Sequence, residues 1–223
     1  MKLALVGYGK MGRMLEQLAP QFGFEVLAKI DVGDDIAAAK GADVAIEFTQ
    51  PDSAPDNIVR LTALGLPVVC GTTGWLGELP RVREAVERSG AALVWSPNFS
   101  IGVNVFTRLV SEAARLLADE TDYGAWAWEI HHITKKDAPS GTLLKLVEAM
   151  KSAGYQRNID VSSNRAGAHP GTHVIGFDSA ADTITLQHAA RGREGLARGA
   201  LKAAQWIRGK RGVFEFGEVL FER

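Results

Sequence analysis

The chain has 223 residues, of which 46% are hydrophobic and 23% are charged, the balance of an ordinary globular protein with a sizeable core. Its net charge of −1 gives no sign of a nucleic-acid-binding surface, and no basic amphipathic stretch indicates a membrane surface, so we expect neither partner. The N-terminal apolar run is too short for a signal peptide, and the single cysteine, Cys70, cannot form a disulfide framework. We therefore expect a cytoplasmic protein in which Cys70 is a buried, unreactive thiol.

Residues 1–101 predict short apolar strands that alternate with amphipathic helices. The expected strands cover residues 3–6, 24–30, 44–48, 67–70 and 91–95. The expected helices cover residues 11–18, a stretch that ends near Gly65, and residues 79–89. Strands that alternate with helices are typical of a parallel sheet with helices on both faces. We therefore predict an α/β fold that contains a Rossmann-type, doubly wound domain.

The pattern changes after Ser100, where Trp126, Trp128 and Ile130 alternate with other residues as the side chains of a strand do. The expected elements are helices over 104–117, 142–153 and 195–208, and strands near 125–130, 173–177 and 183–189, the last two joined as a hairpin. These elements predict a smaller α/β domain with a mixed sheet. We place it at residues 102–189 and expect residues 190–223 to rejoin residues 1–101. The two tryptophans are interpreted as core or interface packing.

A glycine-rich turn follows the first expected strand and opens the first expected helix. It reads Gly7-Tyr8-Gly9-Lys10-Met11-Gly12, the pattern G-x-G-x-x-G. Glycines at these positions permit a tight turn, let a pyrophosphate approach the backbone and let helix and strand pack closely. Asp31 ends the second strand, where a carboxylate can accept hydrogen bonds from an adenosine ribose. The turn therefore predicts dinucleotide binding; a glycine turn used only for packing is the alternative.

Two more loops follow strands of the same expected sheet. The fourth strand is followed by Gly71, Thr72 and Thr73, and the fifth by Ser96, Pro97 and Asn98. Open α/β sheets bind ligands at the carboxyl ends of their strands, so both loops are candidates for cofactor binding. Plain turns without a ligand are the alternative interpretation.

The densest group of polar residues lies between Glu129 and Thr142 and includes His131, His132 and Lys135. A histidine beside lysines suits proton transfer to a small anion. Successive strand residues point to opposite faces, so the two histidines are not expected to bind one metal, and we predict no metal site. An ordinary histidine pair beside solvated lysines is the alternative.

The same group ends in features of a helix N-terminus. Pro139 stops regular structure, and Ser140 can cap a helix that begins at Gly141. The free backbone amides of Gly141 and Thr142 would then form an anion site. His173 and His188, further along the chain, are interpreted as structural.

Residues 129–142 resemble the signature of the 4-hydroxy-tetrahydrodipicolinate reductases, also called dihydrodipicolinate reductases. That signature runs Glu-x-His-His-x-x-Lys-x-Asp-Ala-Pro-Ser-Gly-Thr, and every specified position matches. Other matching segments are residues 7–12, 47–49, 71–74, 98–104, 165–167 and 170–173. The resemblance therefore spans nearly the whole chain.

The resemblance implies hydride transfer from NADH or NADPH to a small cyclic dicarboxylate in diaminopimelate and lysine biosynthesis. It implies His131 as the proton donor or acceptor and Lys135 as the second catalytic residue. The implied substrate ligands are His132, Ser140, Gly141 and Thr142. The implied cofactor ligands are residues 7–12, Asp31, residues 71–73 and residues 96–98. It also implies a homotetramer assembled through the sheet of the substrate-binding domain.

The chain departs from the family's pattern at a few positions. Glu47 replaces a usual aspartate, Ser96 replaces a usual alanine, and only 12 residues separate Asp31 from Val44. Val32 stands where many members have an arginine that can meet the extra phosphate of NADPH. Together with Asp31 this favours NADH mildly, although the nearby lysines at positions 10 and 29 favour NADPH.

Two other functions remain open at the level of sequence. One is a different NAD(P)-dependent amino-acid or imine dehydrogenase on the same scaffold. The other is a non-catalytic NAD-sensing protein, which would need a partner surface that the near-neutral composition does not indicate.

Overall fold

The computed structural model describes residues 1–221 and divides into two compact units. The first comprises Met1–Ile101 together with the chain from Glu194 onward, and the second comprises Gly102–Arg193. The first holds a parallel sheet of six strands and the second a mixed sheet of four, which confirms the predicted α/β class. Within residues 1–221, no helix has the length and apolar character needed to cross a bilayer.

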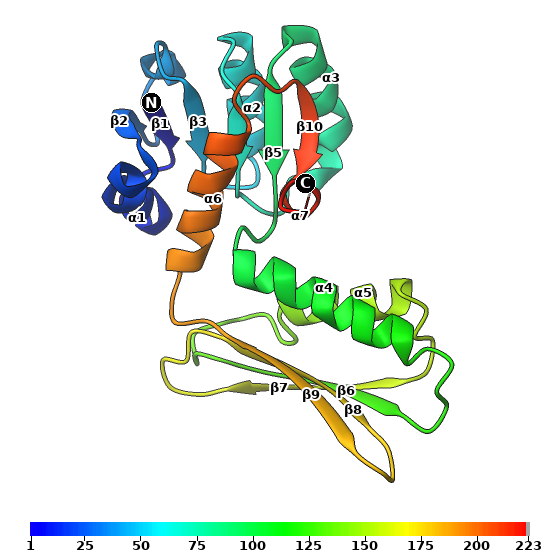
Figure 1. The fold of residues 1–223 in the computed structure, drawn as a ribbon. Coiled ribbons are helices and arrows are strands. Elements are labelled where there is room, and N and C mark those ends of the chain that lie inside the picture. The colour runs from blue at the N-terminus through cyan, green and yellow to red at the C-terminus, as the bar shows by residue number, and fades with distance from the viewer. Residues whose placement is uncertain (222–223) are drawn as a thin grey trace. The chain divides into compact units, whose positions relative to one another are not determined.

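The first unit is built on strands that all run parallel (Figure 1). They are β1 (Lys2–Val6), β2 (Glu25–Ile30), β3 (Val44–Glu47), β4 (Val68–Cys70), β5 (Ala92–Trp95) and β10 (Gly212–Glu215). Their order is β10-β5-β4-β3-β1-β2, so the chain passes from one side of β1 to the other between β2 and β3. Such a reversal marks where ligands bind at the carboxyl edge of an open sheet.

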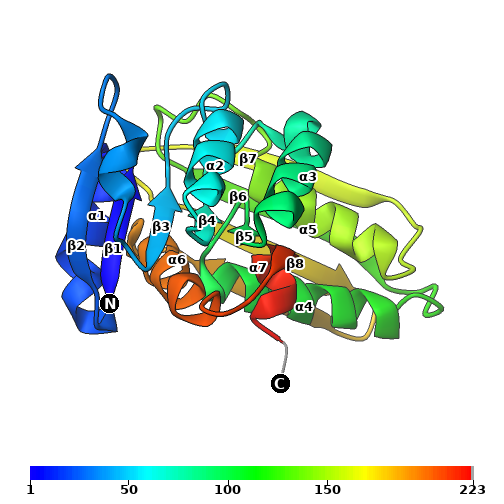
Figure 2. The same cartoon turned by 90° about the horizontal axis from the view of Figure 1, so that it is seen from above.

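Helices cover both faces of this sheet (Figure 2). They are α1 (Lys10–Leu18) and α6 (Glu194–Trp206) on one face, and α2 (Ala54–Ala63) and α3 (Leu79–Ser89) on the other. The short helices are η1 (Ala19–Phe22), η2 (Ile36–Ala39), η3 (Leu76–Glu78) and α7 (Phe216–Val219).

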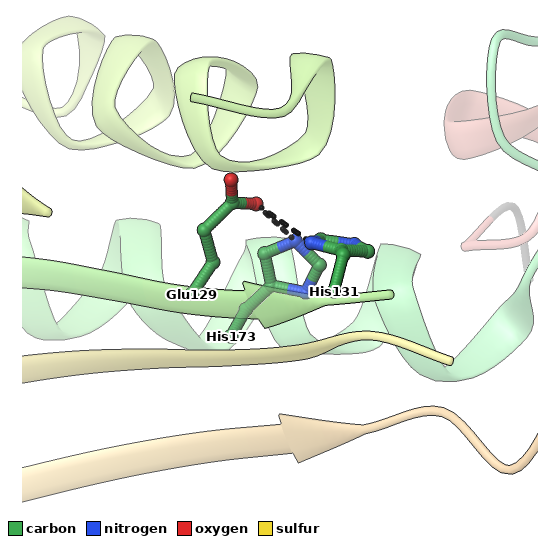
Figure 3. Close-up of side chains that lie close together, drawn as sticks. All are labelled: Glu129, His131 and His173. Carbon is green, nitrogen blue, oxygen red and sulfur yellow. Dashed lines mark ion pairs between the residues drawn. The ribbon is translucent and has the colours of Figure 1, made fainter. Parts of the chain in front are cut away.

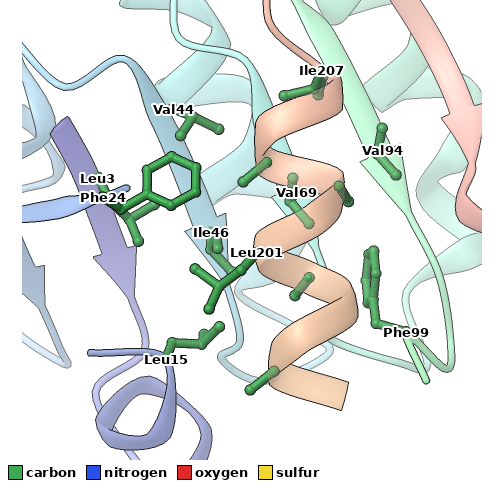
Figure 4. Packing of buried hydrophobic residues seen from close by; sticks show 14 of the residues in the cluster. Leu3, Leu15, Phe24, Val44, Ile46, Val69, Val94, Phe99, Leu201 and Ile207 are labelled. Carbon is green, nitrogen blue, oxygen red and sulfur yellow. The ribbon is translucent and has the colours of Figure 1, made fainter. Parts of the chain in front are cut away.

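Side-chain alternation in β1 explains why both faces need a covering layer. Leu3 and Leu5 join the core beneath α1 and α6, whereas Ala4 and Val6 join the core beneath α2 and α3. Figure 4 shows Leu201 of α6 packed among strand side chains of the first core. A strand that is buried on both faces has a continuous run of apolar residues, and this run predicted β1 from the sequence.

The second unit is a four-stranded sheet with two helices on one face. Its elements are α4 (Ile101–Leu116), β6 (Gly124–His131), α5 (Gly141–Ser152), β7 (Ile159–Arg165), β8 (Thr172–Asp178) and β9 (Thr183–Ala189). The order is β7-β6-β8-β9; β7 runs parallel to β6, and the other pairs are antiparallel. Sequence periodicity missed β7, an edge strand of mostly polar residues, and β10, which has 4 residues.

The two faces of β6 have different roles. Ala125 and Ala127 are buried in the core beneath α4 and α5, and Glu129 and His131 continue on that same face, also buried. Trp126 and Trp128 lie on the opposite face and are partly exposed. The strand therefore carries a carboxylate and an imidazole from the apolar core to its carboxyl end.

Candidate active site

The glycine-rich turn between β1 and α1 is held by close backbone contacts. Gly7 has a φ of +92°, and a Cβ there would lie 2.0 Å from the carbonyl oxygen of Phe48. Around Gly9, by contrast, a Cβ would meet nothing within 4 Å. Gly9 is the N-cap of α1, no side chain caps this end, and the first turn contains no acidic residue. The first amides of α1 are therefore suited to an anion such as the pyrophosphate of a dinucleotide.

Some polar and charged side chains around the turn form hydrogen bonds or ion pairs with one another. The Tyr8 hydroxyl donates to Glu16, and the Lys29 ammonium lies 3.1 Å from Oε1 of the same glutamate. Asp31 is exposed at the end of β2, where its Oδ1 accepts a 3.0 Å hydrogen bond from the amide of Val32. The Val32 side chain is 99% exposed. Lys10 is exposed as well. Lys29, by contrast, is held by its ion pair with Glu16.

The loops after β3 and β4 meet around the buried carboxylate of Glu47. Its oxygens accept hydrogen bonds from the Thr49 amide at 3.1 Å, the Thr72 hydroxyl at 2.7 Å and the Cys70 thiol at 3.1 Å. Burial and the Glu47 charge raise the pKa of Cys70 well above its ordinary value, so the expected buried thiol is confirmed. Thr72 is buried by this network, whereas Thr73 is exposed.

The loop after β5 is fixed by its own polar groups. The Ser96 hydroxyl, which is buried, donates to the carbonyl of Asn98 at 3.0 Å and accepts from the Asn98 amide at 3.1 Å. The Asn98 side chain in turn accepts from the amide of Ser100 at 2.9 Å. Pro97 is exposed between them. The candidate cofactor loops thus follow β1, β4 and β5 at the carboxyl edge of one sheet.

A second polar cluster lies where β6 ends in the other unit. Oε2 of Glu129 is 3.2 Å from Nδ1 of His131 and 3.4 Å from Nε2 of His173 on β8. Figure 3 shows these three side chains close together, with dashed lines for the ion pairs. Oε1 accepts hydrogen bonds from Arg165 at 2.9 Å and from the Ser163 hydroxyl at 3.1 Å, both on β7. Glu129 is fully buried, so these contacts replace the water that the carboxylate loses.

The titration of this cluster reflects its burial. Burial lowers the pKa of His131, although the Glu129 charge opposes the shift. Burial lowers the pKa of His173 further, to about 4. Burial would raise the pKa of the Glu129 carboxyl, but hydrogen bonds from Ser140 and Arg165 outweigh it and hold that pKa below its ordinary value. The carboxylate is thus ionised beside two neutral imidazoles near neutral pH.

Ser140 forms the predicted cap of α5. Its hydroxyl accepts from the Leu143 amide at 3.2 Å and donates to Glu129, while its own amide donates to Glu129 at 2.8 Å. Ser140 is buried, and its amide and hydroxyl are engaged within the protein. Direct contact of this side chain with a ligand stays a prediction.

The remaining candidate residues surround the exposed end of α5. The Lys135 ammonium lies 2.8 Å from Oδ1 of Asp137, and Oδ2 of Asp137 accepts from the Gly141 amide at 3.4 Å. Thr142 follows in the first turn and is partly exposed. His132 has left the strand, and its Nδ1 is 2.7 Å from the Thr134 hydroxyl. Asp137 thus holds the lysine and the helix amide that the sequence assigned to an anionic ligand.

Sequence and structural comparisons identify the family. The N-terminal model of dihydrodipicolinate reductase matches residues 1–99, and its C-terminal model matches residues 102–220. The chain belongs to the dihydrodipicolinate reductase family. It is 36% identical to the 4-hydroxy-tetrahydrodipicolinate reductase of Christiangramia forsetii over 99% of this chain and 98% of that one. It is 35% identical to the enzyme of the same name from Methanoregula boonei, covering 89% and 82%.

Solved structures agree on the fold. A dipicolinate-bound dihydrodipicolinate reductase from Paenisporosarcina sp. TG-14 superposes with a TM-score of 0.83 at 18% identity, covering 96% of this chain and 97% of that one. An amine dehydrogenase from Mycobacterium smegmatis gives a TM-score of 0.68 at 8% identity, covering 97% and 95%. The resemblance inferred from residues 129–142 is therefore confirmed as family membership.

Glu129, Arg165 and His173 are members of the cluster that sequence reasoning did not assign to the site. Glu129 could have been found, because it lies two positions before His131 on the same face of one strand. His173 joins through the pairing of β8 with β6, in which it stands opposite Glu129. Arg165 stands opposite His131 on β7, the strand that periodicity missed.

The cluster also raises the question of a metal ion. Among the described residues, ligand atoms of Glu129, His131 and His173 lie within 4.8 Å of one another. The Ser140 hydroxyl, however, already contacts the carboxylate and lies 3.3 Å from Nε2 of His173. Arg165 supplies a positive charge to the same carboxylate. Because protein groups already satisfy the carboxylate, we interpret the cluster as one that handles protons.

Proposed function

We propose that this protein reduces 4-hydroxy-tetrahydrodipicolinate to tetrahydrodipicolinate with NADH or NADPH, with loss of the hydroxyl group as water, in diaminopimelate and lysine biosynthesis. The observation that carries the proposal is the buried His131 cluster beside the N-terminus of α5, in a chain of this family. An imidazole for proton transfer and helix amides for a carboxylate are what reduction of a small cyclic dicarboxylate requires.

The cofactor is proposed to bind along the carboxyl edge of the first sheet. The uncapped end of α1 and the open space at Gly9 fit the pyrophosphate. Asp31, which is exposed at the end of β2, is proposed to accept from the adenosine ribose. The loops 71–73 and 96–98 are proposed to hold the nicotinamide end, with Glu47 keeping the first of them in place. When bound, the reduced nicotinamide supplies the hydride.

The substrate is proposed to bind at the end of β6 and the start of α5. One carboxylate would accept from the amides of Gly141 and Thr142, with His132 and Lys135 as further donors. To do so it must displace Asp137, which now holds both Lys135 and the Gly141 amide. His131 would exchange the proton, and Lys135 would stabilise the negative charge of the bound substrate.

The cofactor preference is proposed to be a mild bias towards NADH. The Val32 side chain offers no hydrogen-bond donor to a phosphate, and Lys29 is already paired with Glu16. Asp31 can accept from a ribose diol and repels a phosphate at the same position. Lys10 is exposed, and we propose that its ammonium binds the extra phosphate of NADPH and so allows some use of that cofactor.

Assembly is proposed to use the face of the second sheet that carries Trp126 and Trp128. Both are partly exposed on β6, and Trp126 packs over Gly176, where a Cβ would lie 2.1 Å from the ring. A sheet face with large aromatic side chains is stabilised when a second copy covers it. We propose a homotetramer, with the cytoplasm as its location; sedimentation of a stable monomer at micromolar concentration would contradict the tetramer.

The test of function is the oxidation of NADH or NADPH on addition of enzymatically made 4-hydroxy-tetrahydrodipicolinate. We expect turnover that depends on this substrate, and competition by planar pyridine dicarboxylates but not by the corresponding monocarboxylates. Reduction of other imino or keto acids in its place would indicate a different dehydrogenase. Cofactor binding without any turnover would indicate a sensing protein.

A further inference from the structure

We propose that Glu129 is the positioning residue for His131: it holds the ring proton on Nδ1, so that Nε2 is the atom that exchanges a proton with the substrate. The proposal rests on the proposed function, because it assigns an atom to the proton transfer of that reaction. It adds a residue that does not touch the substrate and acts through the imidazole.

The position of the Nδ1 atom decides which nitrogen carries the proton. Nδ1 of His131 is buried, lacks a hydrogen-bond partner among the described residues, and lies 3.2 Å from the ionised Oε2 of Glu129. The two atoms are close without forming an aligned hydrogen bond, but a lone pair so near an anionic oxygen would be repelled, whereas an N–H there is attracted. The neutral ring is therefore protonated on Nδ1, and its basic lone pair is on Nε2.

The carboxylate is fixed firmly enough to impose this choice. Its Oε1 accepts from the Ser140 amide at 2.8 Å, from Arg165 at 2.9 Å and from Ser163 at 3.1 Å. Its Oε2 accepts from the Ser140 hydroxyl. Donors from β7 and from the start of α5 therefore clamp Glu129 from two elements, and the carboxylate cannot turn away from His131.

His173 shares the carboxylate without competing for the proton. Its Nε2 lies 3.4 Å from Oε2 of Glu129, and its pKa of about 4 keeps it neutral at neutral pH. Its ring meets that of His131 edge to face, with centroids 5.1 Å apart. His173 thus fixes the plane of the His131 ring and leaves His131 as the group that gains a proton.

The other edge of the His131 ring lies beside a glycine. Gly171 has a φ of +137°, and a Cβ there would lie 2.8 Å from Nε2 of His131. A side chain at position 171 would therefore press on the nitrogen that we assign to proton transfer. Glycine at this position avoids that contact.

The charge balance around His131 sets the expected effect of removing the carboxylate. The charged and titratable groups around it, from its own strand, the following loop, β7 and β8, are Glu129, His132, Lys135, Arg165 and His173. Glu129 is the negatively charged member of this group, and its charge raises the pKa of His131. Glu129→Gln should lower that pKa further, so activity that needs the protonated imidazole should decline from a lower pH.

The first measurement is imidazole nitrogen NMR of the whole protein without substrate, which is independent of turnover. We expect the Nδ1–H form of His131 in the wild type and loss of that single form in Glu129→Gln. An Nε2–H form in the wild type would overturn the proposal. So would a stoichiometric metal ion bound at Glu129, His131 and His173 in the purified protein.

The second measurement is kinetic. Glu129→Gln should lower kcat by about 10²- to 10⁴-fold, the scale for a histidine held in the wrong tautomer, with KM for substrate changed little. Glu129→Asp, which keeps the charge, should recover part of kcat. Glu148→Gln, the same substitution at an exposed position of α5, is the matched control and should stay near wild-type kcat.

The outcomes separate the two proposals. An unchanged kcat and pH profile in a folded Glu129→Gln variant would overturn the positioning role. If Glu129→Gln does not fold, the wild-type tautomer and the Glu129→Asp kinetics still decide the matter. A wild-type protein with the Nδ1–H tautomer but no turnover of the proposed substrate would instead contradict the proposed function.

Discussion

Within residues 1–221, each unit of the molecule buries one glutamate completely near the carboxyl end of a strand, Glu47 on β3 and Glu129 on β6. Among the described residues, the hydrogen-bond donors to Glu47 are neutral: a backbone amide, hydroxyls and a thiol. Glu129 contacts an arginine, two imidazoles, two hydroxyls and a backbone amide.

Because their donors differ, the two buried carboxylates have different effects on their surroundings. The donors to Glu47 come from the loop after β3, from the end of β4 and from the loop after it, so its charge joins the two loops and shifts the pKa of the Cys70 thiol. The donors to Glu129 include groups that themselves gain or lose protons, so its charge alters the proton affinity of His131. In the proposed function, one carboxylate therefore organises a binding edge, and the other is coupled to the chemistry.

The largest effect should come from removing the imidazole itself. His131→Gln should lower kcat by about 10²- to 10⁴-fold, because a general acid–base group is lost. His132→Gln should mainly raise KM, since His132 lies beyond the end of β6 and is proposed as a donor to the substrate carboxylate. Steady-state kinetics of both variants test this. A His131→Gln variant with near-normal kcat would show that the Glu129–His131 cluster does not take part in the reaction.

The next effect concerns the cation beside Glu129. Arg165→Met should lower the free energy of unfolding by about 3–5 kcal/mol, because it leaves a buried carboxylate without its ion pair. The double variant Arg165→Met, Glu129→Gln should recover much of this loss, since no charge remains to be compensated. Denaturant unfolding of the single and double variants measures both values, and equal stability of the two would contradict the assigned role of the arginine.

His173 should make stability depend on pH. Its pKa is about 4 in the folded protein and 6.5 ordinarily, so between these values the unfolded chain binds a proton that the folded one does not. The free energy of unfolding should therefore fall as pH drops from 6.5 to about 4, by up to about 1.4 kcal/mol per pH unit. His173→Gln should flatten this slope in urea titrations. Part of it should remain, because the pKa of His131 is lowered too.

Sequence patterns identified the elements whose apolar residues have a clear period. β1 and the helices α1, α3 and α6 were expected close to their observed bounds, because each buries a continuous or periodic apolar face. β7 could not be found this way, since Asp160, Ser162 and Asn164 occupy one face of this edge strand. The family signature named His131, but the contacts of Glu129 with Arg165 and His173 depend on strand register, which period alone does not give.

Disturbing the neutral network around Glu47 should have a smaller effect. Glu47→Gln keeps the shape but turns one acceptor into a donor facing Thr72 and Cys70, so unfolding free energy should fall by about 1–3 kcal/mol. Its kinetic effect should be a higher KM for NADH with kcat and the pH profile nearly unchanged. A shifted pH profile would show that this carboxylate is coupled to the chemistry after all.

The smallest effect should come from the exposed carboxylate of Asp31, where solvent screens the charge. We predict that the wild type prefers NADH by about tenfold or less in kcat/KM, which corresponds to about 1.4 kcal/mol. Asp31 favours the ribose diol, Val32 offers no phosphate ligand, and Lys29 is held by Glu16. Asp31→Ser should raise the relative use of NADPH, and Glu16→Gln should do the same by releasing Lys29. Measuring kcat/KM with both cofactors decides this: a wild type that strongly prefers NADPH, or a ratio unchanged in Asp31→Ser, would show that discrimination does not depend on Asp31.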